Sequence, residues 1–200
     1  MTADFKTIIF TSPISLKDEQ LLITMLLESG VIDFIHLRKP GMEIHRMRNL
    51  IKRIPNEFHE RIKIHDNFQL LDEFNLHGPH LNSRNPVSSN INFPVSKSCH
   101  SIKELSDSGD FEYVTLSPIY DSISKNSYHT PFILSDLKKH IKNKNVIALG
   151  GVTPDKFPEL KEYGFYGAAL LGYFWEEISI YNIKYRIDEI RKFKSMVLEN

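Results

Sequence analysis

The sequence has a single cysteine, Cys99, and no excess of charge of either sign. One cysteine excludes a disulfide framework within the chain and favours a reducing compartment. Lysine and arginine together number 25, as do aspartate and glutamate, so the chain has no overall attraction to nucleic acid or to a membrane surface. Any anion-binding site must therefore be local.

Long hydrophobic runs are also lacking. No stretch approaches the ~20 apolar residues that span a bilayer, and the N-terminus lacks the pattern of a signal peptide. The chain has 200 residues, of which 41% are hydrophobic and 25% charged, and this suits one domain with a sizeable core. We expect a cytoplasmic protein that forms one domain over residues 1–200, and the sequence leaves homo-oligomerisation open.

Short apolar runs alternate with amphipathic stretches along the whole chain. The predicted strands are 6–11, 31–38, 61–65, 77–81, 94–98, 111–116, 146–149 and the run that ends at Leu171. The predicted helices are 17–29, 43–53, 68–74, one that begins at Ser101, 134–141, 154–163 and one or two within 174–198.

Eight strand-then-helix units of this kind imply parallel pairing and a closed (β/α)8 TIM barrel, an α/β fold. An open doubly wound sheet is the alternative. The Gly-x-Gly-x-x-Gly motif of a dinucleotide-binding fold is absent from the first strand.

Glycines mark the ends of the last two predicted strands. Gly150 and Gly151 follow one apolar run, and Gly172 follows the next. Thr153 and Pro154 are a suitable N-cap and first helical residue. Backbone N–H groups at such turns can bind an anion, and the loops after strands 7 and 8 of TIM barrels often hold a phosphate. An ordinary packing turn is the alternative.

The active site of a TIM barrel lies at the carboxyl ends of its strands. Side-chain alternation places His36 and Arg38 on one face, and likewise Ser98 and His100. A buried guanidinium is costly unless it meets an anion, so we interpret Arg38 as an anion ligand. A structural ion pair between Arg38 and Asp66 is the alternative.

Histidines gather at the predicted strand ends. Of the nine in the chain, four lie there: His36, His65, His80 and His100. A metal-dependent barrel hydrolase is therefore one hypothesis, although no strand carries His-x-His and only Asp66 offers a carboxylate at a strand end. A structural, hydrogen-bonded role is the alternative for each histidine.

Five motifs, in order along nearly the whole chain, resemble those of the thiamine phosphate synthases and the related TenI-like thiazole tautomerases. The motifs are DFIHLRK at 33–39, HGPHL at 77–81, SCHSIKEL at 98–105, VTLSPIYDSISK at 114–125 and ALGGVTP at 148–154. The resemblance implies a TIM barrel of thiamine biosynthesis. The synthases of this family join hydroxymethylpyrimidine diphosphate to thiazole phosphate, release pyrophosphate and use Mg²⁺ on the leaving diphosphate.

The resemblance implies roles for Arg38, Lys125, Ser98, Asp66 and the glycines Gly150, Gly151 and Gly172. The other residues below are expected at the site because they lie at the strand ends or, for Arg84, beside Asn85. The expected catalytic set is Arg38, Ser98, Lys125 and His100. The expected substrate-binding set is His36, Lys39, His80, Arg84, Gly150, Gly151, Leu171 and Gly172. Asp66 is the expected Mg²⁺ ligand. A solvated surface lysine is the alternative for Lys125.

Some positions depart from the family pattern. Asn85 replaces a second Mg²⁺ aspartate, which removes a charge from the metal site. Pro40 stands at a family lysine that Lys39 could replace, and His65 at an asparagine. Pro118 stands where the tautomerases carry their proton-transferring histidine, a role that another strand-end histidine could take.

We therefore take the synthase as the first hypothesis and a TenI-like tautomerase as the second. A non-catalytic thiazole-phosphate-binding or regulatory protein is the third. In all three the expected ligands are small phosphorylated molecules.

Overall fold

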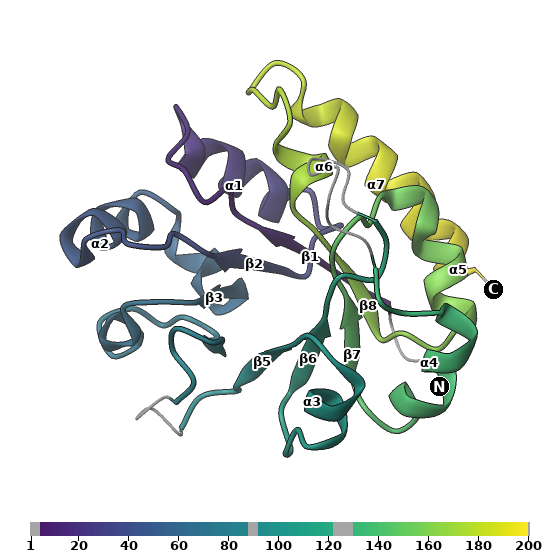
Figure 1. Cartoon of the computed structure of the whole chain (residues 1–200). Coiled ribbons are helices and arrows are strands. Elements are labelled where there is room, and N and C mark those ends of the chain that lie inside the picture. Colours follow the sequence, from purple (N-terminus) through teal and green to yellow (C-terminus); the bar gives the residue numbers. More distant parts are fainter. Residues whose placement is uncertain (1–4, 88–91, 122–129, 200) are drawn as a thin grey trace.

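The computed structural model describes residues 5–87, 92–121 and 130–199. Within them, eight parallel strands pair in chain order and β8 pairs with β1, which closes the barrel (Figure 1). The predicted TIM barrel is thereby confirmed, and the open sheet is excluded. None of the helices in these residues is both long and apolar enough to cross a membrane.

The strands match the predicted runs and are mostly shorter at their ends. They are β1 (Lys6–Phe10), β2 (Phe34–Leu37), β3 (Ile62–Ile64), β4 (Gly78–Leu81), β5 (Ser96–Cys99), β6 (Tyr113–Leu116), β7 (Val146–Ala148) and β8 (Gly167–Leu170). The α-helices are α1 (Glu19–Glu28), α2 (Ile44–Lys52), α3 (Ile102–Ser106), α4 (Leu134–Ile141), α5 (Phe157–Glu162), α6 (Gly172–Trp175) and α7 (Ile183–Leu198). Three 3₁₀ turns complete the list for the described residues: η1 (Asn56–Arg61), η2 (Phe68–Leu71) and η3 (Pro154–Lys156).

Two predicted helices differ in detail. The segment predicted at 68–74 forms only the turn η2, and the chain leaves the helical pattern after Leu71. The segment predicted at 154–163 divides into η3 and α5, because Pro158 has no N–H to donate to Pro154. The Thr153 hydroxyl donates to the Asp155 carboxylate and does not cap the backbone.

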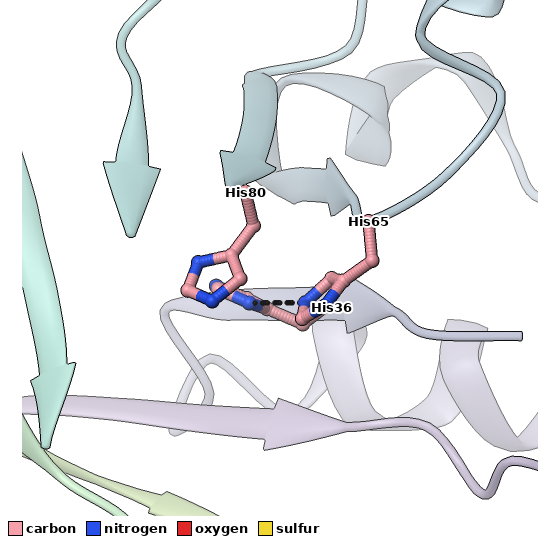
Figure 2. A group of neighbouring side chains, drawn as sticks. All are labelled: His36, His65 and His80. Carbon is pink, nitrogen blue, oxygen red and sulfur yellow. Dashed lines mark hydrogen bonds between the residues drawn. The ribbon is translucent and has the colours of Figure 1, made fainter. Parts of the chain in front are cut away.

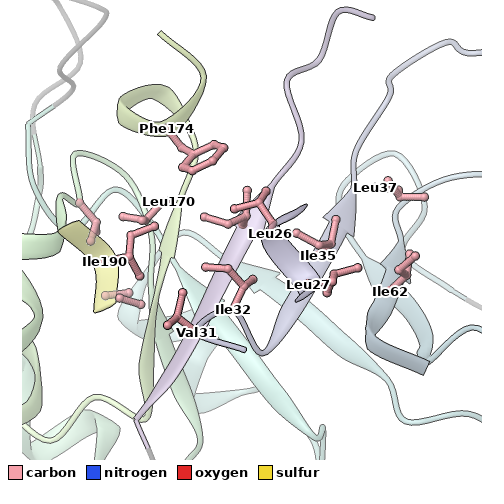
Figure 3. Packing of buried hydrophobic residues seen from close by; sticks show 14 of the residues in the cluster. Leu26, Leu27, Val31, Ile32, Ile35, Leu37, Ile62, Leu170, Phe174 and Ile190 are labelled. Carbon is pink, nitrogen blue, oxygen red and sulfur yellow. The ribbon is translucent and has the colours of Figure 1, made fainter. Parts of the chain in front are cut away.

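Alternation along the strands creates two cores. On β1, Ile9 faces the helices, whereas Ile8 and Phe10 face the barrel interior. Residues such as Leu26, Ile35, Ile62, Leu170 and Ile190 fill the outer layer (Figure 3).

The barrel interior is apolar on one side and polar on the other. Ile8, Phe10, Tyr113, Ile147 and Ala169 form its small apolar cluster. Buried polar side chains from β2, β3 and β4 stand beside them: His36, Lys63 and His80. A TIM-barrel interior is normally filled by branched apolar residues, so these polar side chains call for a chemical explanation.

Candidate active site

A cavity of about 400 Å³ opens at the carboxyl ends of the strands. Small-molecule sites typically measure about 300–1,000 Å³. The cavity is lined in part by residues at the predicted strand ends and turns. These are Arg38, His65, Arg84, Ser98, His100, Ser117, Pro118, Gly150, Gly151, Leu171 and Gly172. The carboxyl-end rule therefore located the cavity correctly.

Seven lining residues were not predicted: Phe10, Asn82, Ser83, Leu149, Val152, Ala169 and Tyr173. Asn82 directly follows β4 and Tyr173 follows Gly172, so the same strand-end rule could have found both. Phe10 ends β1 and stacks on His36 with ring centroids 4.4 Å apart. Its apolar character gave no sign of a place at the site.

Arg38 follows β2 and is half-buried. Burial lowers the pKa of its guanidinium, as does the nearby Arg84, while Asp66 opposes the shift. Within the residues that the structure describes, no carboxylate lies within ion-pair distance of Arg38, so the alternative pair with Asp66 is not formed. A partly buried cation without a partner suits the binding of an anion.

Asp66 lies beside Arg84 and Asn85. Its Oδ1 accepts a hydrogen bond from Asn85 Nδ2 at 2.7 Å and lies 3.6 Å from Arg84 Nε. Its Oδ2 is buried and has no hydrogen-bond partner in the described part of the chain. This oxygen has the chemistry to bind a cation, although Asp66 is not itself part of the cavity wall.

Ser98 is held by a buried histidine. Its Oγ lies 2.9 Å from His80 Nε2, and His80 Nδ1 lies 2.8 Å from Ser96 Oγ. Burial, with the nearby Lys63, lowers the pKa of His80 to about 3. His80 is therefore neutral near pH 7, and it contacts the lining serine although it does not itself line the cavity.

His36, His65 and His80 pack together inside the barrel (Figure 2). His36 Nδ1 lies 2.9 Å from His65 Nε2, and His36 Nε2 lies 2.6 Å from the Tyr113 hydroxyl. Burial lowers the pKa values of His36 and His65 well below the ordinary value. His36 is fully buried and, unlike His65, is not part of the cavity wall.

Lys39 points away from the cavity. Its Nζ forms an ion pair with Glu19 and donates to the carbonyls of Ser12 at 2.7 Å and Ile14 at 2.8 Å. The side chain follows Arg38 directly, so alternation turns it to the other face. The expectation that Lys39 replaces a substrate-binding lysine is corrected, because its three N–H bonds are already used.

The remaining expected catalytic residues are His100 and Lys125. His100 is exposed at the cavity, and its Nδ1 lies 3.1 Å from Ser117 Oγ. Lys125 lies outside the described residues.

The glycine turns, which contain Gly150, Gly151 and Gly172, expose backbone atoms to the cavity. Gly150 and Gly151 have positive φ angles of 89° and 66°. A Cβ at Gly151 would lie 2.3 Å from the Asp121 carbonyl oxygen, which excludes any side chain there without movement. The hydrogen bonds of the described residues include none donated by the backbone N–H of Gly150, Gly151 or Gly172. Such free N–H groups suit an anion.

Comparison with known proteins shows similarity over most of the chain. A family model described as thiamine monophosphate synthase matches residues 8–173. The thiamine-phosphate synthase of Lactococcus lactis subsp. cremoris is 23% identical over 176 residues, which are 80% of each chain. The putative thiamine-phosphate synthase 2 of Aquifex aeolicus is 26% identical over 163 residues, 76% of this chain and 87% of that one.

A solved structure is closer still. The crystal structure of thiamine phosphate pyrophosphorylase from Bacteroides thetaiotaomicron is 33% identical with a TM-score of 0.84, covering 96% of this chain and 98% of that one. The motifs, the closed barrel and these matches agree. The chain belongs to the thiamine monophosphate synthase family.

Proposed function

We propose that the cavity joins hydroxymethylpyrimidine diphosphate to thiazole phosphate and releases pyrophosphate, the transferase reaction of thiamine phosphate synthases. One observation carries this proposal. The cavity has two sets of anion-binding groups: Arg38 and Arg84 after β2 and β4, and the free N–H groups of the glycine turns after β7 and β8. A reaction between two phosphorylated substrates needs two such places.

The arginine side would take the diphosphate. Charge-assisted hydrogen bonds from Arg38 and Arg84 stabilise the negative charge that grows on the leaving pyrophosphate. With its proton on Nε2, His80 donates to Ser98 Oγ. The Ser98 hydroxyl is then free to donate its own proton to the same leaving group.

The glycine side would take the thiazole phosphate. The N–H groups of Gly150, Gly151 and Gly172 are fixed by the backbone, so they bind an anion without ordering any side chain. Because these groups lie beside Leu171, the thiazole would lie against an apolar wall.

The residues fit Mg²⁺ on a single carboxylate. Mg²⁺ is usually bound through one or two carboxylates together with substrate phosphates. Asp66 Oδ2, a buried oxygen without a partner among the described residues, offers one such ligand. Asn85 turns its amide nitrogen toward Asp66 and adds no charge. When bound, Mg²⁺ would neutralise charge on the diphosphate.

A product assay tests the proposed function. Purified protein with both substrates and Mg²⁺ is expected to form thiamine phosphate and pyrophosphate, detected by chromatography. Absence of product across a range of Mg²⁺ concentrations would overturn the proposal. Isomerisation of the thiazole carboxylate tautomer, measured in parallel, would instead support the tautomerase.

The glycine turn can be tested by Gly151→Ala. Saturation of the wild-type protein with thiazole phosphate, at about 100 times Kd, is expected to add roughly 2.7 kcal/mol of stability in a thermal denaturation assay. The variant should gain clearly less at the same ligand concentration, because its Cβ displaces the turn from the Asp121 carbonyl.

Gly30→Ala is the matched control. Gly30 has a similar positive φ of 72° but no atom within 4 Å of its would-be Cβ. It should lose stability through backbone strain and keep the full response to ligand. Equal responses in the two variants would remove Gly151 from the phosphate site.

A further inference from the structure

The three histidines inside the barrel have no complete role in the proposed reaction. His80 positions Ser98, but His36 contacts no cavity group other than His65 and Phe10. Each of the three is at most 1% exposed. One ring nitrogen from each histidine can be chosen so that the three nitrogens all lie within 4.8 Å of one another.

We propose that His36, His65 and His80 bind a divalent transition-metal ion at a site separate from Asp66. The three come from β2, the end of β3 and β4, which are neighbours in the barrel (Figure 2). Tetrahedral zinc with Zn–N bonds of about 2.0–2.1 Å spaces its nitrogens roughly 3.3 Å apart. The 2.9 Å pair of His36 and His65 is already close to that spacing.

Metal binding requires the three imidazole rings to move slightly relative to one another. The imidazoles of His65 and His80 are 4.3 Å apart between centroids and tilted by 30°, so the two rings lie nearly face to face. Rotation about their side-chain bonds exchanges the hydrogen bond between His36 and His65 for bonds from both rings to the metal.

Two of the outer nitrogens already have the partners that metal-binding histidines need. His36 Nε2 faces the Tyr113 hydroxyl at 2.6 Å, and His80 Nδ1 faces Ser96 Oγ at 2.8 Å. Partners of this kind fix the tautomer and the ring orientation. In the metal-bound form His80 would carry its proton on Nδ1, toward Ser96, and its Nε2 would exchange the contact with Ser98 Oγ for the ion. The burial that keeps all three rings neutral near pH 7 leaves them in the form that binds metal.

The three nitrogen ligands determine which metal ions suit the site. Three imidazole nitrogens suit Zn²⁺, Co²⁺ or Ni²⁺, whereas Mg²⁺ prefers oxygen ligands. Phe10 packs against all three rings and closes the site on one side. His65 and Ser98 line the cavity, which supplies a route of entry and a fourth ligand, from water or from Ser98 Oγ.

A metal titration tests the site without reference to enzyme activity. Full-length protein without an affinity tag is stripped with a chelator and titrated with Zn²⁺ against a chromophoric indicator, in excess Mg²⁺ to occupy Asp66. We expect one equivalent to bind. Co²⁺ in place of Zn²⁺ should give the visible absorption of a tetrahedral site.

Variants assign the ligands. His36→Gln should weaken Zn²⁺ binding by more than about 100-fold, and Tyr113→Phe by about 10- to 100-fold, as found for such partners. His45→Gln, on the exposed face of α2, and Cys99→Ser should bind as the wild type does. Circular dichroism of each variant verifies that it is folded.

Two results would overturn the proposal. One is the absence of stoichiometric Zn²⁺ binding to the wild-type chain, which needs no variant to fold and leaves the histidines as a hydrogen-bonded cluster. The other is unchanged binding by folded His36→Gln. The titration measures metal binding and the product assay measures thiamine phosphate formation, so a failure of the metal site is distinguished from a failure of the proposed function.

Discussion

Arg38→Ala is expected to lower kcat/KM for thiamine phosphate formation by roughly 30- to 5,000-fold and to leave the melting temperature almost unchanged. Removal of one partner from a desolvated charge pair costs about 2–5 kcal/mol, and each 1.36 kcal/mol is tenfold in rate. The loss should appear in catalysis and not in folding, because Arg38 has no ion pair among the described residues. Steady-state kinetics and thermal denaturation of the same samples measure the two effects.

Two further variants sharpen this test. Arg38→Lys keeps the charge but not the planar guanidinium, so it should recover only part of the activity. Arg46→Ala removes an exposed arginine of α2 and should change neither quantity. Parallel losses of activity and stability in Arg38→Ala would instead assign Arg38 a structural role.

Lys39→Met is expected to destabilise the fold by about 3–5 kcal/mol, because it leaves Glu19 as a buried charge without a partner. The two side chains are 0% and 4% exposed. For a chain of this length the loss corresponds to a fall of about 6–20 °C in melting temperature. Below its own unfolding transition the variant should keep kcat/KM near the wild-type value.

The double variant Lys39→Met, Glu19→Leu is the control. Removal of both charges should restore most of the stability, since two apolar side chains replace the ion pair. Burial raises the pKa of Glu19 above its ordinary value. The deficit of the single variant should therefore be largest at neutral pH and shrink as the pH falls, because protonation then removes the unpaired charge.

A fall in kcat/KM at full folding would contradict this interpretation of Lys39. It would show that the lysine acts on substrate, as the resemblance first implied, and that its contacts with Glu19 and two carbonyls open during turnover. Unchanged stability would separately show that the ion pair contributes little to folding.

Much of the site was predictable because it depends on local rules. Arg38, Ser98 and Gly150 each interrupt an apolar run, and parallel strands in a barrel bring their carboxyl ends to one mouth. Alternation along a strand correctly paired Ser98 with His100 at the cavity. The same rule puts Lys39 on the opposite face from Arg38, although the family motif had suggested that Lys39 binds substrate.

Other features depended on partners distant in the sequence. The partner of Lys39 is Glu19 of α1, and that of Asp66 is Asn85 after β4. No spacing in the chain links such residues, because the contacts form only when separate βα units pack together.

By itself the sequence determined the eight strands, the family and many of the residues at the mouth, since all of these follow from periodicity, turn residues and motifs. Only the tertiary structure decided which of those residues share a surface. Barrel closure turned His36, His65 and His80 inward from neighbouring strands into one buried cluster. It also left Arg38 unpaired within the described residues. The physical reason is that strand register and helix packing, which set these distances, are properties of the whole barrel.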